Sequence, residues 1–169
     1  MKHSERLELF ENVRARYSVF LTSVLWKLTG DKELFTEAMQ YSLFGIWRNV
    51  EKLKGEKAGA YIYRIALTAN SKAWRNRVGR NGEIPNDPID PGEDADERLD
   101  RAEAAAIVRR EISRLPKKQA GAIVMRYLEQ QDYQAIAEKL SCSKAGARSN
   151  VSRAMAALKA KFAVLTQRE

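Results

Sequence analysis

The chain has 169 residues, of which 44% are hydrophobic, so it can fill one medium-sized core or two small ones, and disorder throughout is excluded. Its 30 Lys and Arg against 22 Asp and Glu give a formal net charge of +8, which favours a polyanionic partner such as nucleic acid or an acidic membrane surface. With Cys142 as its one cysteine, the chain cannot form an internal disulfide. Its one histidine, His3, lies at the N-terminus, where chain ends fray, so we expect neither a Cys/His metal cluster nor a Cys/His catalytic pair.

Charge is divided unevenly along the sequence. Residues 1–80 carry 15 basic and 8 acidic side chains, residues 81–104 carry 2 and 9, and residues 105–169 carry 13 and 5. Two basic blocks therefore flank one acidic stretch. No apolar run reaches the roughly 18 residues of a membrane span, and the charged N-terminus is unlike a secretory signal. We therefore expect a cytoplasmic protein.

The first basic block has helical spacing of apolar residues from Leu7 to Trp74. Gly30 and Asp31 are typical of a helix end and of the cap of the next helix, which we expect over 32–50. The glycines and lysines of 51–60 predict a flexible basic loop, and a third helix follows over 61–78. We assign Trp26 and Trp47 to the core.

The acidic stretch predicts a linker over 79–98, because it holds three prolines, three glycines and seven of the 22 carboxylates. After it, helical patterns run over 99–115 and 119–128, and Pro116 is placed to begin a helix at its first turn. The expected organisation is a domain over 1–78, a linker over 79–98 and a domain over 99–169.

The stretch AIAEKLSCSKAGARSNVSRA, residues 135–154, predicts a helix-turn-helix. Asp132 can cap a helix that ends at Leu140, and Ser143 can cap a second helix, with Cys142 pointing inward in the turn between them. The inward set of the second helix is Ala147, Val151, Ala154 and Leu158. Arg148, Ser149 and Ser152 lie opposite, with Arg153 at the flank, and Arg and Ser are residue types that contact base edges in the major groove. The alternative is an Ala-rich helical hairpin whose charges are merely solvated.

The C-terminal block resembles region four of the extracytoplasmic-function (ECF) group of bacterial sigma factors, the promoter-recognition subunits of RNA polymerase. YQAIAEKL is similar to that family's Y-x-x-I-A-x-x-L helix, and AGARSNVSRA is similar to its G-T-V-K-S-R-L-x-R-A recognition helix. The direct matches in the second motif are Arg148, Ser149, Arg153 and Ala154. The N-terminal block, from about residue 10 to residue 77, resembles region two, most clearly in YIYRIALTAN, and TEAMQY (36–41) takes the place of the family's acidic E-D-L-V-Q-E helix.

This resemblance implies an all-α protein of two small domains that binds core RNA polymerase, through its clamp helices and its flap, and promoter DNA. It implies an anti-sigma factor as a further partner, no enzymatic activity, no metal, no cofactor and no small-molecule substrate. The expected −35 contacts are Lys144, Arg148, Ser149, Ser152 and Arg153. The expected −10 contacts are Lys52, Lys54, Lys57, Tyr61, Thr68, Lys72 and Arg75. The expected polymerase contacts are Glu37, Gln40, Tyr41 and Phe44.

Some of these roles also follow from the residues themselves. The three lysines of the loop can neutralise phosphates. Thr68, Lys72 and Arg75 recur at about one-turn spacing and can follow one DNA edge. Tyr61 and Trp74 can stack on bases, although core packing is the favoured alternative for both.

A stand-alone helix-turn-helix regulator, which would bind duplex DNA as a dimer without polymerase, is the alternative function. A nucleic-acid-processing enzyme is disfavoured, because the carboxylates gather in the linker rather than in metal-ligand spacing.

Overall fold

The computed structural model describes residues 3–80 and 95–166. Within these ranges the chain forms seven α-helices, one short 3₁₀-helix and no strand, which confirms the predicted all-α fold. The N-terminal half contains α1 (His3–Thr29), α2 (Lys32–Asn49), the 3₁₀-helix η1 (Val50–Leu53) and α3 (Ala58–Arg80). The C-terminal half contains α4 (Ala95–Arg114), α5 (Lys117–Tyr127), α6 (Tyr133–Leu140) and α7 (Lys144–Thr166).

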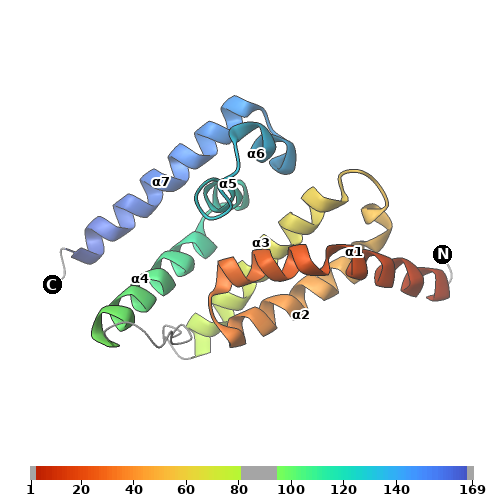
Figure 1. The fold of residues 1–169 in the computed structure, drawn as a ribbon, viewed down its shortest axis with the longest axis horizontal. Helices are drawn as coiled ribbons and strands as arrows, with labels where there is room; N and C mark the ends of the chain where they lie inside the picture. Colours follow the sequence, from red (N-terminus) through yellow and green to blue (C-terminus); the bar gives the residue numbers. More distant parts are fainter. Residues whose placement is uncertain (1–2, 81–94, 167–169) are drawn as a thin grey trace.

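Helices α1, α2 and α3 pack against one another as a three-helix bundle (Figure 1). The predicted boundary between the first two helices is confirmed, because Gly30 ends α1 with a φ of +63° and Asp31 Oδ1 accepts the Leu34 N–H at 2.9 Å. The same carboxylate oxygen lies 2.7 Å from Nη1 of Arg77, near the end of α3. One acidic side chain therefore caps α2 and joins it to α3.

Two tryptophans differ from expectation. Trp26 is 41% exposed, so its assignment to the core is wrong; its ring packs edge-on against Phe35 with the centroids 5.4 Å apart. Trp47 is half-buried rather than enclosed, and Phe10 and the Arg6 guanidinium cover its ring. In each case neighbouring side chains cover only part of the indole.

In the C-terminal half, α5, α6 and α7 pack together, and α4 contacts both α5 and α7. Helix α3 runs two residues into the predicted linker, and α4 begins at Ala95, four residues before the expected start at Leu99. Residues 81–94 of that linker lie outside the described residues. Pro116 is the N-cap of α5 rather than its first helical residue, a shift of one position.

The two halves meet where α3 packs against α4, α5 and α6 and where α1 contacts α4. We call the part of this contact between α3 and helices α5 and α6 the seam (Figure 1). It is defined by Tyr63 and Leu67 of α3, Gly121 of α5 and Leu140 of α6. All three side chains are at most 2% exposed. A Cβ added at Gly121 would lie 3.0 Å from Leu140 Cδ2, 3.1 Å from Leu67 Cδ1 and 3.4 Å from Tyr63 Cε1. A side chain at position 121 would therefore require its neighbours in α3 and α6 to shift by a few tenths of an ångström.

The seam also encloses polar atoms. The Tyr63 hydroxyl is buried, and Oε1 of Glu129, just after α5, is buried as well. Burial, followed by the neighbouring negative charge of Glu129, raises the pKa of Tyr63 well above its usual range. The neutral phenol is therefore the form that the folded protein favours.

Candidate nucleic-acid interface

The helix-turn-helix begins with a capped α6. Asp132 Oδ1 accepts the Ala135 N–H at 2.8 Å, which confirms the predicted N-cap. At the other end Ser141 adopts the left-handed conformation, with φ 51° and ψ 57°, and the Cys142 N–H donates to the Ala137 carbonyl at 3.0 Å. Ser143 Oγ then accepts the Gly146 N–H at 3.0 Å and caps α7, as predicted. A three-residue turn thus ends one helix and starts the next.

Helix α7 divides into a buried side and an exposed side. The expected inward residues Ala147, Val151, Ala154 and Leu158 are at most 7% exposed, so that prediction is confirmed. On the opposite side, Lys144, Arg148, Ser152 and Arg153 are exposed and Ser149 is half-buried. Cys142 is half-buried and packs against the core below the turn. The structure therefore brings all five expected −35 residues together on α7.

An aromatic residue that the sequence analysis did not single out lies beside this surface. The ring centroid of Tyr133 is 5.4 Å from Cζ of Arg148 and 4.9 Å from Cζ of Arg126. These residues come from α6, α7 and α5, respectively. The sequence holds one usable signal for this contact: Tyr133 directly follows the cap residue Asp132, so it starts the first helix of the predicted motif.

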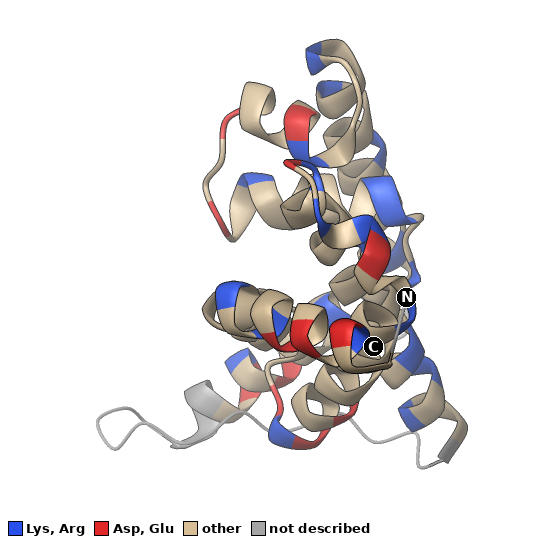
Figure 2. Ribbon diagram, turned by 90° about the vertical axis from the view of Figure 1, so that its right-hand side faces the viewer, with Lys and Arg blue, Asp and Glu red and all other residues tan. Residues whose placement is uncertain are grey.

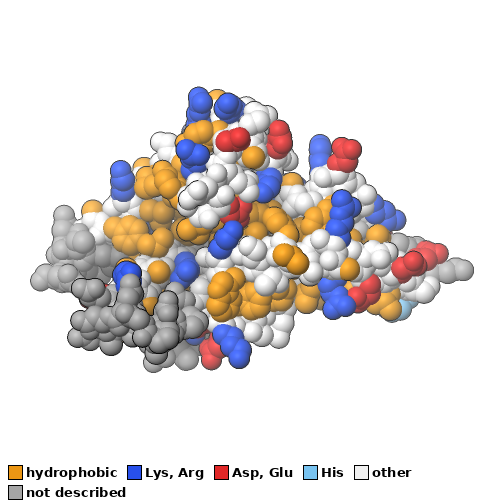
Figure 3. All heavy atoms as spheres, viewed as in Figure 1, with side chains coloured by type: hydrophobic (Ala, Val, Ile, Leu, Met, Phe, Trp, Pro, Cys, Tyr) orange, Lys and Arg blue, Asp and Glu red, His pale blue; other side chains and the backbone are white. Residues whose placement is uncertain are grey.

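The expected −10 residues follow η1, the loop after it and one side of α3. Lys52, Lys54 and Lys57 are exposed, and Lys57 lines a cleft of about 650 Å³ across from Glu138 and Lys139 of α6. In the space-filling view, several Lys and Arg side chains project from the upper edge, where α7 begins and where this loop lies (Figure 3). Figure 2 shows that Lys and Arg occur on helices of both halves.

On α3 itself, Thr68, Lys72 and Arg75 are exposed along one side. Tyr61 is half-buried, and its hydroxyl donates to Asn49 Oδ1 at 3.0 Å. Trp74 is only 2% exposed, in keeping with the favoured core alternative. The exposed side of α3 is therefore polar and basic, and it lacks an accessible indole.

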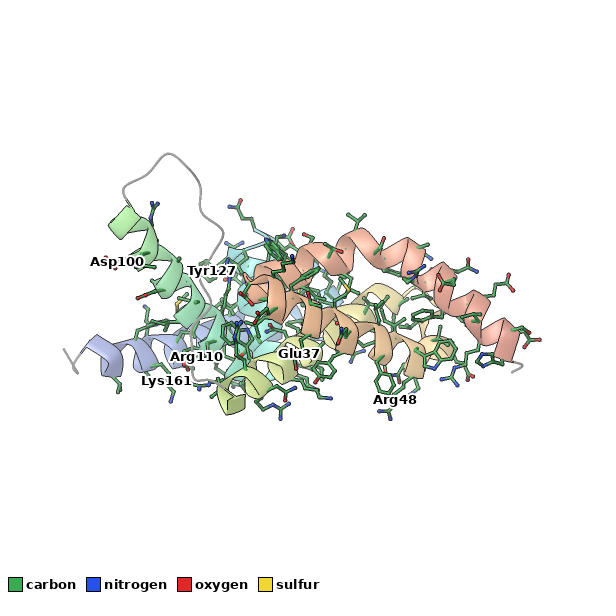
Figure 4. The ribbon with its side chains drawn as sticks, turned by 90° about the horizontal axis from the view of Figure 1, so that it is seen from below. Glu37, Arg48, Asp100, Arg110, Tyr127 and Lys161 are labelled. Carbon is green, nitrogen blue, oxygen red and sulfur yellow. The ribbon has the colours of Figure 1, made fainter. Side chains whose placement is uncertain are left out.

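The expected polymerase contacts on α2 divide into two pairs. Glu37 and Tyr41 are tied to α3, because Asn76 Nδ2 donates to Glu37 Oε1 and to the Tyr41 oxygen, each at 2.7 Å. The Lys72 ammonium also lies 3.9 Å from the Tyr41 ring centroid. Gln40 and Phe44, by contrast, are exposed, Phe44 by 59%. Figure 4 shows Glu37 and Arg48 in opposite halves of α2; the Arg48 guanidinium lies 5.8 Å from the Phe44 ring centroid.

In the described ranges, 3–80 and 95–166, no group of three or more His, Cys, Asp or Glu side chains is arranged to hold a metal ion. None of the helices that the structure describes is long and apolar enough to cross a membrane.

Comparison with protein families assigns both halves. Residues 14–79 match the model of sigma-70 region 2, and residues 105–158 match the model of sigma-70, region 4. No curated relative matches at a significant level. The first match covers α1 to α3, and the second runs from within α4 into α7. The region 4 model is of the type found in ECF sigma factors. The chain therefore belongs to the sigma-70 family and is an ECF-type sigma factor, a factor of transcription initiation.

Proposed function

We propose that this sigma factor binds core RNA polymerase and directs it to promoters, where it reads a −35 element as duplex and a −10 element as its strands open. The observation that carries the proposal is the exposed Arg and Ser side of α7, which lies opposite a fully apolar buried side on a capped helix-turn-helix. Arg donors match guanine edges in the major groove, and Ser can pair with several bases. Lys144, at the start of α7, contacts phosphate.

For the −10 element we propose that Lys52, Lys54 and Lys57 neutralise phosphates while the bubble forms. Thr68, Lys72 and Arg75 extend this contact along α3. The exposed part of the half-buried Tyr61 ring is available for base stacking, while its hydroxyl remains bound to Asn49. The proposed domain over residues 1–78 would thus carry the −10 contacts, and the proposed domain over 99–169 the −35 contacts, with 79–98 as the linker.

For polymerase we propose that α2 docks on the clamp helices, with Gln40 and Phe44 in direct contact. Glu37 and Tyr41 face the same partner from positions that Asn76 holds by hydrogen bonds. The C-terminal domain docks on the flap. An anti-sigma factor occludes one or both domains, and the protein acts in the cytoplasm, where promoter DNA is found; these two proposals rest on family membership alone.

In vitro transcription on a promoter library, with core polymerase present and the protein either included or omitted, tests the proposal. We expect transcripts from a defined subset of promoters only when the protein is included. Binding of the isolated protein to a palindromic duplex as a dimer, with no effect on polymerase, would instead favour a stand-alone regulator.

A further inference from the structure

The ring of Tyr133 joins three successive helices of the C-terminal half. Two guanidinium groups lie within cation–π distance of its centroid, Arg126 at 4.9 Å and Arg148 at 5.4 Å. Arg148 belongs to the exposed side of α7, whereas Arg126 belongs to α5 and is half-buried. One aromatic ring therefore lies between an arginine of α5 and a residue of the proposed −35 surface.

The ring is itself held in place. Tyr133 is the first residue of α6, directly after the N-cap Asp132, and its side chain packs against the hydrophobic core. Its neighbour Arg126 donates from Nη1 to the Gln131 carbonyl at 3.1 Å, in the loop that leads into α6. The Tyr133 ring, which Arg148 contacts, is thus held in place by the cap of α6, by apolar packing and by Arg126.

The contact with Tyr133 leaves the N–H groups at the edge of the Arg148 guanidinium available to a base. A cation–π contact uses the flat face of a guanidinium, whereas a bidentate contact with guanine uses the N–H groups at its edge. Among the residues that the structure describes, no carboxylate pairs with Arg148 and no carbonyl accepts from it. Arg153 is similarly exposed, but in the same described ranges it has no aromatic neighbour. The two arginines therefore differ in one respect: only Arg148 is held in place before DNA arrives.

We propose that Tyr133 is a positioning residue that sets base choice at one −35 position by orienting Arg148. This inference rests on the proposed function, since it requires Arg148 to contact a base. A long flexible side chain loses rotamer freedom when it binds, and a ring that restricts it beforehand lowers that loss for the one geometry it favours. The ring thereby sharpens discrimination at the base that Arg148 meets.

The experiment compares full-length variants assembled with core polymerase, using a promoter library randomised across the −35 element. Arg148→Ala and Arg153→Ala first identify the base position that each arginine reads. We expect Tyr133→Leu to lower discrimination about two- to fivefold at the Arg148 position, the loss equivalent to an exposed cation–π contact, and to leave the Arg153 position unchanged. Tyr133→Phe keeps the ring and should retain wild-type discrimination.

A double variant distinguishes an effect that acts through Arg148 from an indirect effect on folding. If Tyr133 acts through Arg148, then Tyr133→Leu combined with Arg148→Ala matches Arg148→Ala alone at that position. Equal loss at every position, or wild-type discrimination in Tyr133→Leu, overturns the inference while leaving −35 recognition intact. If the wild type selects no −35 sequence, the proposed −35 role itself fails and the inference fails with it.

Discussion

Replacing Gly121 with Ala tests how tightly the seam is packed. The new Cβ would lie 3.0 Å from Leu140 Cδ2 and 3.1 Å from Leu67 Cδ1, and both leucines are only 2% exposed. Neither side chain has open space to enter, so the neighbours must shift by a few tenths of an ångström. Overpacking of this kind costs about 1–3 kcal/mol. The higher helix propensity of Ala than of Gly, by contrast, stabilises the folded state by about 1 kcal/mol.

The balance predicts that Gly121→Ala lowers the free energy of unfolding by about 1 kcal/mol, which for a chain of this size lowers the thermal midpoint by about 2–4 °C. Gly121→Val should lower it by about 3 kcal/mol, because its extra methyl groups enlarge the clash and β-branching weakens the helix. Urea unfolding followed by far-UV circular dichroism at 25 °C measures both changes.

Gly79→Ala is the matched control, because a Cβ at Gly79 in α3 meets nothing within 4 Å. We expect it to stabilise the protein by about 0.3–0.5 kcal/mol, less than at mid-helix because Gly79 lies next to the end of α3. The two substitutions should therefore have opposite signs. If Gly121→Ala stabilises as much as Gly79→Ala does, the seam is loosely packed and the reasoning from its distances is refuted.

Three other predictions test local features. Because the folded state raises the pKa of Tyr63, its contribution to stability is complete below the unfolded pKa of about 10 and is lost as pH rises above it. In urea unfolding, Tyr63→Phe should therefore lose less stability than the wild type does between pH 8 and pH 10.5. Identical losses in the two proteins would contradict a raised pKa of Tyr63 in the folded state. Asp132→Ala removes the cap of α6 and should cost about 1 kcal/mol in the same assay. Asp132→Asn should retain most of the wild-type free energy of unfolding. If Asp132→Asn loses as much stability as Asp132→Ala does, capping is not the cause. Lys52→Ala combined with Lys54→Ala should reduce permanganate reactivity of the −10 bubble more than duplex binding, and unchanged reactivity would exclude a role in opening.

Features that depend on neighbouring residues in the sequence could be predicted before the structure. Asp31, Asp132 and Ser143 each cap a helix, as expected, because a cap bonds to a backbone N–H only three residues away. The buried side of α7 also follows from local periodicity. These signals suffice to place the helix-turn-helix and its exposed side.

Features that depend on contacts between distant helices could not be predicted in this way. Trp26 is large and apolar, which favours the core, yet it is 41% exposed, because its burial depends on how distant helices pack around the end of α1. Likewise, the seam requires Gly121 to meet α3, more than fifty residues earlier in the chain. The hydrogen bonds of Asn76 with Glu37 and Tyr41, which join α3 to α2, are non-local for the same reason.

The division of α7 into a buried and an exposed side has a consequence for how promoter choice can change during evolution. The fold depends on small and aliphatic side chains at Ala147, Val151, Ala154 and Leu158, all enclosed by the core. The intervening exposed positions contribute little to that packing, and substitutions at such positions usually change stability by less than about 0.5 kcal/mol. If this exposed side reads the −35 element, as proposed, mutations there can alter the preferred promoter almost independently of stability. Divergence of regulons among related chains can therefore accumulate on one side of this helix while the other stays constant.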